Sequence, residues 1–440
     1  MRLARSLTLR TAPTALLLTV ALTSGRAQAD VTLVDHDGWS FYATGLVAAH
    51  YQLVKGDADP PIGQKALVGG RILDELYTSD QRNMTITLSD IRSGFIGTQM
   101  GFGINRQINQ DVHIESLFSI SMEGINSNRG QNLQKDVDYR EGWGAIVSKW
   151  GTLKFGRMFG MFGEGSAEVM LMAYRYGVGH PCVINSATIA CGSSGAGPIY
   201  PGFDGAIRYI SPRFVGFQAA VSVADPVIGP ILKMSPQPRV DGELNFDQSF
   251  GPLHLRLIGQ GMWDQIAAST APTMMDPGGT LKVDTVWGAM GTGFATFNFG
   301  SGFLMLGGGG WQGRGVGERI PMENDDPANP IAYDGSLELR KFTGLYGNAQ
   351  LEFMGHSLTF GGGRLRITPT AIDDMATQSL VLTQNAEYHV TYHYKWDAIV
   401  FNVEFMHWTS DWHADVTMMP VPPAPHQGLN FMGGGVNYVF

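Results

Sequence analysis

Apolar and polar residues alternate along much of the chain, most clearly in its second half. In the stretch LHLRLIGQ, Leu253, Leu255 and Leu257 fall on one side. His254 and Arg256 fall on the other. Because the side chains of a β-strand alternate between its two faces, this pattern predicts strands with one face in an apolar medium and one in a polar medium. The stretches GFQAAVSV, AEYHVTYHY and AIVFNVEFMHW repeat it.

Sixteen such segments follow one another, in eight pairs. The predicted strands cover residues 39–54, 90–104, 110–123, 140–148, 151–158, 203–210, 215–224, 240–249, 252–263, 284–298, 302–312, 341–353, 357–367, 384–394, 398–409 and 428–440. Short connections alternate with long polar ones, which include residues 55–89, 159–202, 264–283, 313–340 and 410–427. Short turns at one end and long loops at the other, over an even number of strands, are typical of an outer-membrane β-barrel.

Composition supports a barrel over the alternative, a large soluble β-sandwich. Charged residues make up 16% of the chain, where ~25% is ordinary, and 58 of 440 residues are glycine, about twice the usual share. A sandwich would keep more charge on its outside, and it would not need its long loops at one end. A closed barrel also removes edge strands and satisfies every backbone group in lipid. We expect one domain.

The first 29 residues predict a cleaved signal peptide. Arg2, Arg5 and Arg10 precede an apolar stretch at 15–22, and Ala27-Gln28-Ala29 forms a small-x-small cleavage site. We therefore expect residues 1–29 to be removed and residues 30–440 to form the barrel. The mature chain would carry 26 basic and 39 acidic residues, a net charge of −13. This acidic balance argues against a nucleic-acid partner, because proteins that bind nucleic acid show a basic footprint.

Four stretches resemble the general trimeric porins of Gram-negative bacteria. These are IRSGFIG (91–97), REGWGAIVSKWGTLKFGR (140–157), GAIRYISPRFVGFQAAV (205–221) and the terminal GVNYVF. The resemblance implies an all-β, 16-stranded antiparallel transmembrane barrel with short periplasmic turns, long extracellular loops and a third loop folded inward. It also implies a homotrimer in the outer membrane, with a water-filled pore in each subunit for passive diffusion of ions and small hydrophilic solutes.

Four basic and two acidic residues are candidates for the constriction of such a pore. The resemblance and the alternation together give the wall residues Arg92, Arg140, Lys154 and Arg208, and the loop at 159–202 gives Glu164 and Glu168. Opposite rows of charge around a narrow point would orient water and polar solutes. The loop lacks the P-E-F-G-G-like core of the enterobacterial porins, which leaves open which acidic residues line the pore.

The end of the chain also follows the barrel pattern. Val436, Tyr438 and Phe440 alternate with polar or small residues, so we expect them to face lipid in a last strand that closes against the first. In the family that the chain resembles, a terminal Phe with this alternation is the signal read by the outer-membrane barrel assembly machinery. We expect Cys182 and Cys191 to form one small disulfide, as is usual for an isolated cysteine pair in an exported protein.

Other functions find less support in the sequence. The mature length of 411 residues leaves room for a substrate-specific barrel, for instance a sugar channel with 18 strands. A barrel-form enzyme is a further alternative, although neither G-x-S-x-G nor H-E-x-x-H occurs. We expect no catalytic residue, no cofactor and no metal site, and we interpret the acidic row of Asp241, Glu243 and Asp247 as lumen wall. Trp408 and Trp412 are expected in an interfacial aromatic girdle.

Overall fold

Neighbouring barrel strands pair antiparallel and close into the predicted 16-stranded barrel, which excludes the 18-stranded alternative. In the computed structural model the described residues are 31–57, 66–68, 85–122, 137–179, 194–226, 232–233, 237–269, 281–317, 332–334, 336, 338–375, 379–413 and 424–440. The predicted signal peptide, Cys182 and Cys191 lie outside them.

Twenty strands are described. Their bounds are β1 Val31–His36, β2 Trp39–Asp57, β3 Ala66–Val68, β4 Thr85–Arg92, β5 Thr98–Asn109, β6 Val112–Met122, β7 Val137–Ser148, β8 Gly151–Phe159, β9 Phe203–Ile210, β10 Phe217–Ala224, β11 Leu232–Lys233, β12 Arg239–Phe250, β13 Leu253–Ser269, β14 Leu281–Phe299, β15 Gly302–Arg314, β16 Lys341–Phe353, β17 His356–Thr368, β18 Ser379–Trp396, β19 Ile399–Trp412 and β20 His426–Val439. Of these, β1, β3 and β11 are short additions that pair with β2, β18 and β13, and one barrel strand is split into β4 and β5. The remaining strands agree closely with the predicted segments. Two helices, α1 Glu164–Tyr174 and α2 Ala371–Met375, complete the described elements.

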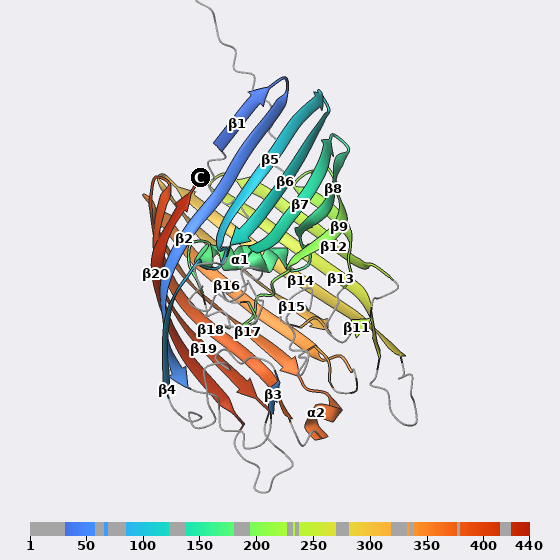
Figure 1. Ribbon diagram of the computed structural model, residues 1–440, viewed down its shortest axis with the longest axis vertical. Helices are drawn as coiled ribbons and strands as arrows, with labels where there is room; N and C mark the ends of the chain where they lie inside the picture. Colours follow the sequence, from blue (N-terminus) through green and yellow to red (C-terminus); the bar gives the residue numbers. More distant parts are fainter. Residues whose placement is uncertain are drawn as a thin grey trace, which may run out of the picture.

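The barrel closes where β20 pairs with β2, from Leu46 opposite Val439 to Gly56 opposite Leu429. Phe440 extends this pairing, since it exchanges two backbone hydrogen bonds with Gly45. The short turns and the end of the chain lie at the upper end in Figure 1, where the hairpins β1–β2, β5–β6 and β7–β8 project beyond the other strands. The other ends of strands such as β13, β14, β18 and β19 lie at the opposite end.

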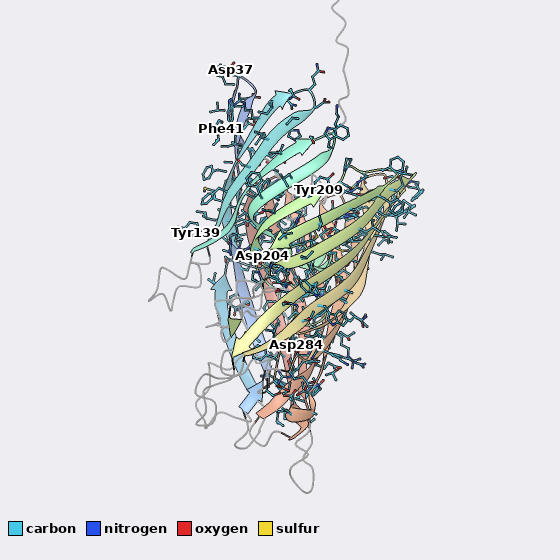
Figure 2. All side chains as sticks on the ribbon, turned by 90° about the vertical axis from the view of Figure 1, so that its right-hand side faces the viewer. Asp37, Phe41, Tyr139, Asp204, Tyr209 and Asp284 are labelled. Atoms are coloured by element: carbon cyan, nitrogen blue, oxygen red, sulfur yellow. The ribbon has the colours of Figure 1, made fainter. Side chains whose placement is uncertain are left out.

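The alternation in the sequence becomes an apolar outer face and a polar lumen. In β19, Val403 is 62% exposed on the outside, whereas its neighbour Glu404 is 3% exposed and points inward. Phe41 and Tyr139 project from the outer surface in the same way (Figure 2). An outer surface of large apolar side chains suits hydrocarbon, and polar side chains inside suit water, as in outer-membrane barrels.

Two regions differ from the predicted strands. The second predicted strand, 90–104, is split into β4 and β5, because residues 93–97 leave the sheet. Gly94 and Gly97 adopt positive φ there (94° and 77°), a conformation that glycine takes without steric cost, and Phe95 turns into the interior. In addition, β1 pairs with the start of β2 and so continues the position of β20 beyond Phe440.

The expected aromatic girdle at Trp408 and Trp412 is wrong. Both side chains are buried on the lumen side of β19, because they have the same parity as Glu404. Their rings pack in the two main apolar clusters of the interior.

The connection between β8 and β9 enters the barrel and forms α1, which lies across the interior in Figure 1. This helix packs on the inner side of β14 to β18. Its residues Met170, Ala173 and Tyr174 are fully buried, so the methionine-rich composition of this segment serves packing. Among the described residues, no helix is long and apolar enough to cross a membrane.

Candidate pore constriction

The first turn of α1 is fixed to the wall by a side-chain amide. Gln260 of β13 accepts a hydrogen bond from the Gly163 backbone N–H (3.2 Å) and donates one to the Met161 carbonyl (2.6 Å). Gly163 has a φ of 102°, which a residue with a Cβ rarely adopts. Inside the helix, Ser166 donates to the Ile199 carbonyl (2.6 Å) and so joins α1 to the segment that returns to β9.

Residues 176–179, which we call the latch segment, fix the other end of α1. The Tyr176 carbonyl accepts hydrogen bonds from His50 Nε2 of β2 and Asn437 Nδ2 of β20, both at 3.0 Å. The Glu404 carboxylate accepts hydrogen bonds from the backbone N–H groups of Val178 (2.7 Å) and Gly179 (3.2 Å). The helix is therefore held at both ends by wall residues.

Each of the two candidate acidic residues contacts an arginine on the wall. Glu164 lies 3.4 Å from Arg208 of β9, and Glu168 lies 2.6 Å from Arg256 of β13. Burial raises the pKa of Glu164 to about 8 and that of Glu168 to about 7, and the nearby guanidinium groups offset this only in part. Arg256 was not among the residues predicted from the sequence. It alternates with the leucines of β13, and this alternation places its side chain on the lumen face.

The candidate basic residues occupy neighbouring wall strands. Lys154 of β8 is opposite Arg208 in the β8–β9 register, and its ammonium lies 3.6 Å from the centre of the Trp143 ring. Arg140 of β7 donates to the Ile96 carbonyl (3.0 Å), and its guanidinium lies over Phe203. Arg92 is the last residue of β4 and lies opposite His50; its side chain is not among those that the structure describes.

A bulge in β7 turns two neighbouring charged residues into the lumen. One residue of β6, Ile120, lies opposite both Tyr139 and Arg140, so the alternation in β7 shifts by one position. Tyr139 points outward and is 64% exposed, whereas Arg140 and then Glu141 point inward. Glu141 accepts hydrogen bonds from Trp143 Nε1 (3.1 Å) and, at the limit of the range, Ser119 (3.5 Å).

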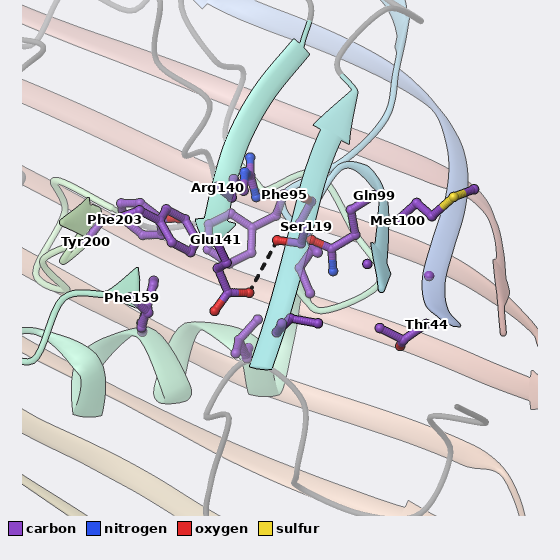
Figure 3. A pocket seen from close by; sticks show the side chains of 16 residues that line it. Thr44, Phe95, Gln99, Met100, Ser119, Arg140, Glu141, Phe159, Tyr200 and Phe203 are labelled. Carbon is purple, nitrogen blue, oxygen red and sulfur yellow. Dashed lines mark hydrogen bonds between the residues drawn. The ribbon is translucent and has the colours of Figure 1, made fainter. Parts of the chain in front are cut away.

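A cavity of about 70 Å³, which we call the wall pocket, separates α1 from this wall (Figure 3). It lies on the side of α1 away from β14 to β18. Its lining is Thr44, Gly45, Phe95, Ile96, Gln99, Met100, Gly101, Leu117, Ser119, Arg140, Glu141, Phe159, Ala167, Leu171, Tyr200 and Phe203. Figure 3 shows Phe159, Tyr200 and Phe203 gathered at one end, beside Arg140 and Glu141, with Gln99 and Met100 at the other.

Other charged side chains of the lumen pair with one another. Arg239 is buried between Asp204 and Asp241, to both of which it donates hydrogen bonds. Asp247 pairs with Arg213 (2.7 Å) and His254 (2.6 Å), near the turn between β9 and β10. Across the described residues, no group of three or more His, Cys, Asp or Glu side chains is arranged to hold a metal ion.

Comparisons with known proteins agree with this architecture. The family model described as Gram-negative porin matches residues 14–417. The outer-membrane channel DcaP of Acinetobacter baumannii has a similar structure, with a TM-score of 0.59 and 12% identity over 93% of this chain and 100% of that one. The anion-selective porin from Comamonas acidovorans gives a TM-score of 0.53 and 13% identity over 91% of this chain and 100% of that one. No curated protein matches by sequence.

Proposed function

The chain belongs to the Gram-negative porin family, and from this premise we propose that a charged constriction at α1 controls what passes through its pore. The protein is an outer-membrane channel for passive diffusion. In the proposed constriction, Arg140, Lys154 and Arg208 form a basic wall, together with Arg92. Glu164 and Glu168 form the acidic side on the helix.

One observation carries this proposal: α1 holds two carboxylates inside the closed barrel, next to wall arginines. Charges in a narrow passage with low-dielectric walls act strongly on a permeating ion, because little water screens them. Glu164 contacts Arg208, and Glu168 contacts Arg256. The wall pocket meets α1 at Ala167 and Leu171, on the same face as the two acidic residues, and is bordered by Arg140 and Glu141. Opposite charges there would orient polar solutes.

We also propose that the protein works as a homotrimer and without catalysis. Trp39, Phe41 and Ile114 are exposed on the hairpins that project beyond the barrel, and a neighbouring subunit would cover such apolar surface. We propose that Tyr438 of β20 and Phe440 just after it, whose rings stack with centres 5.7 Å apart, act as the signal for the barrel assembly machinery.

Planar-bilayer recordings test the constriction. In a salt gradient at about pH 9, where Glu164 is ionised, Glu164→Gln is expected to move the reversal potential toward anions. Arg92→Gln is expected to move it toward cations. Asp247→Asn is the control for charge removal, because it also removes one lumen carboxylate, but this carboxylate pairs with Arg213 and His254 and not with a residue of α1. Unchanged conductance and selectivity in both test variants would contradict the charged constriction.

A further inference from the structure

Four aromatic side chains meet at one end of the wall pocket. Phe159 packs edge-to-face with Phe203 and Tyr200, at ring-centre distances of 5.2 and 5.7 Å, and Phe95 approaches Tyr200 at 6.3 Å. They come from the break between β4 and β5, the end of β8 and the start of β9. Phe95 is buried in an apolar cluster of the interior, and Phe159 and Tyr200 pack half-buried against it. Pockets lined by such rings with a few polar groups are typical ligand sites.

The polar groups of the wall pocket carry both signs of charge. The bulge in β7 places Arg140 and Glu141 side by side on the lumen face, although neighbours in a regular strand point to opposite faces. Arg140 is suited to a carboxylate, which it can bind through two parallel hydrogen bonds. Glu141 is suited to an ammonium group, and aromatic ring faces attract the same group. A solute with only one charge would meet one repulsive partner.

The size of the wall pocket limits what can enter. Its volume of about 70 Å³ is roughly half of the 150 Å³ that holds one benzene molecule in an enclosed apolar cavity. A single flat ring can therefore insert only in part, while its head group stays beside Arg140 and Glu141. Larger ring systems are too bulky.

We propose that the wall pocket binds zwitterionic solutes that carry one aromatic ring, such as free aromatic amino acids, as they pass through the channel. The ring lies against Phe159, Tyr200 and Phe203, the carboxylate against Arg140, and the ammonium group against Glu141. The proposal rests on the proposed channel function and adds a solute class to it.

Bilayer recordings with four probes test this recognition. L-phenylalanine is expected to reduce the current saturably. Glycine lacks the ring, phenylacetate lacks the ammonium group and phenethylamine lacks the carboxylate. Each is expected to need at least about a tenfold higher concentration for half-block, because one charge-assisted contact or the ring burial is lost.

Substitutions test the location. Arg140→Gln and Glu141→Gln are each expected to weaken the block by L-phenylalanine about tenfold. Arg213→Gln and Asp247→Asn remove the same charges at a lumen position outside the wall pocket, and they are expected to leave the block unchanged. Since Arg140 also donates to the Ile96 carbonyl, its variant can fail to assemble, and the isosteric Glu141→Gln then decides alone.

The outcomes distinguish a failure of solute binding at the wall pocket from a failure of the channel function. Normal current with no saturable block by L-phenylalanine overturns this proposal and leaves the channel function intact. Equal block by glycine and L-phenylalanine overturns the role of the ring, and unchanged block in Glu141→Gln overturns the location. Absence of any current in the unmodified protein overturns the channel function, and the proposal with it.

Discussion

Glu404→Gln is expected to loosen the latch segment and with it the C-terminal end of α1. The buried carboxylate accepts hydrogen bonds from the backbone N–H groups of Val178 and Gly179. Glutamine keeps the size of the side chain but offers one neutral oxygen acceptor. One charge-assisted bond is then lost and the other becomes an ordinary one.

The magnitude follows from these two bonds. A hydrogen bond to a charged group contributes about 1.5–3 kcal/mol and a neutral one about 1 kcal/mol, so the substitution costs the attached state about 2–5 kcal/mol. Every 1.4 kcal/mol is a factor of ten in an equilibrium constant, so the lower bound alone raises the detached population about 30-fold. The barrel strands are unaffected, because the change is local to the latch segment.

Hydrogen exchange measures this change directly, because the two N–H groups are themselves the exchanging sites. In the variant, peptides that cover residues 176–179 are expected to exchange about 30-fold faster, and open-channel current noise is expected to rise. Glu387→Gln is the matched control, since Glu387 is a buried lumen carboxylate on β18 that contacts His389 instead. Equal exchange in wild type, Glu404→Gln and Glu387→Gln would refute the proposed role of Glu404.

Three further results are expected. Burial raises the pKa of Glu164 to about 8, so its negative charge is present above that pH and lost below it. Selectivity should therefore move toward anions as pH falls from about 9 to about 6. A reversal potential that does not change with pH would argue against a role of Glu164 in selectivity. Deleting Phe440 removes its two backbone hydrogen bonds with Gly45, so the yield of assembled barrel should fall; wild-type yields would rule out an assembly role. Asp373→Asn removes the carboxylate that pairs with the buried Arg340 and should lower the free energy of unfolding by about 3–5 kcal/mol in a denaturant titration. An unchanged midpoint would show that the pair contributes little.

Alternation predicted the barrel strands well, because lipid outside and water inside impose opposite preferences on neighbouring residues. Val403 and Glu404 show this most clearly. The break at residues 93–97 was missed, because only the backbone angles of Gly94 and Gly97 reveal it, and 58 glycines give no indication of which ones bend the chain. The expectation for Trp408 was wrong although its parity with Glu404 indicates the lumen, because a tryptophan suits a buried apolar cluster as well as a membrane interface.

The candidate site was harder to predict, because its contacts join residues far apart in the chain. Sequence reasoning named Glu168 but not its partner Arg256, since nothing local shows which wall strand the helix faces. Glu141 was also missed. If Arg140 faces the lumen, regular alternation places the next residue, Glu141, on the outside. Only the bulge opposite Ile120 turns Glu141 inward.

The double hydrogen bond on the Tyr176 carbonyl has a consequence for the order of folding. One donor, His50, belongs to the first barrel strand, and the other, Asn437, belongs to the last. This acceptor site is complete only after both ends of the chain have met, so the helix reaches its final position late. A growing, still open barrel therefore keeps a wide interior, and in a folding time course protection of the latch segment should follow the pairing of β2 with β20.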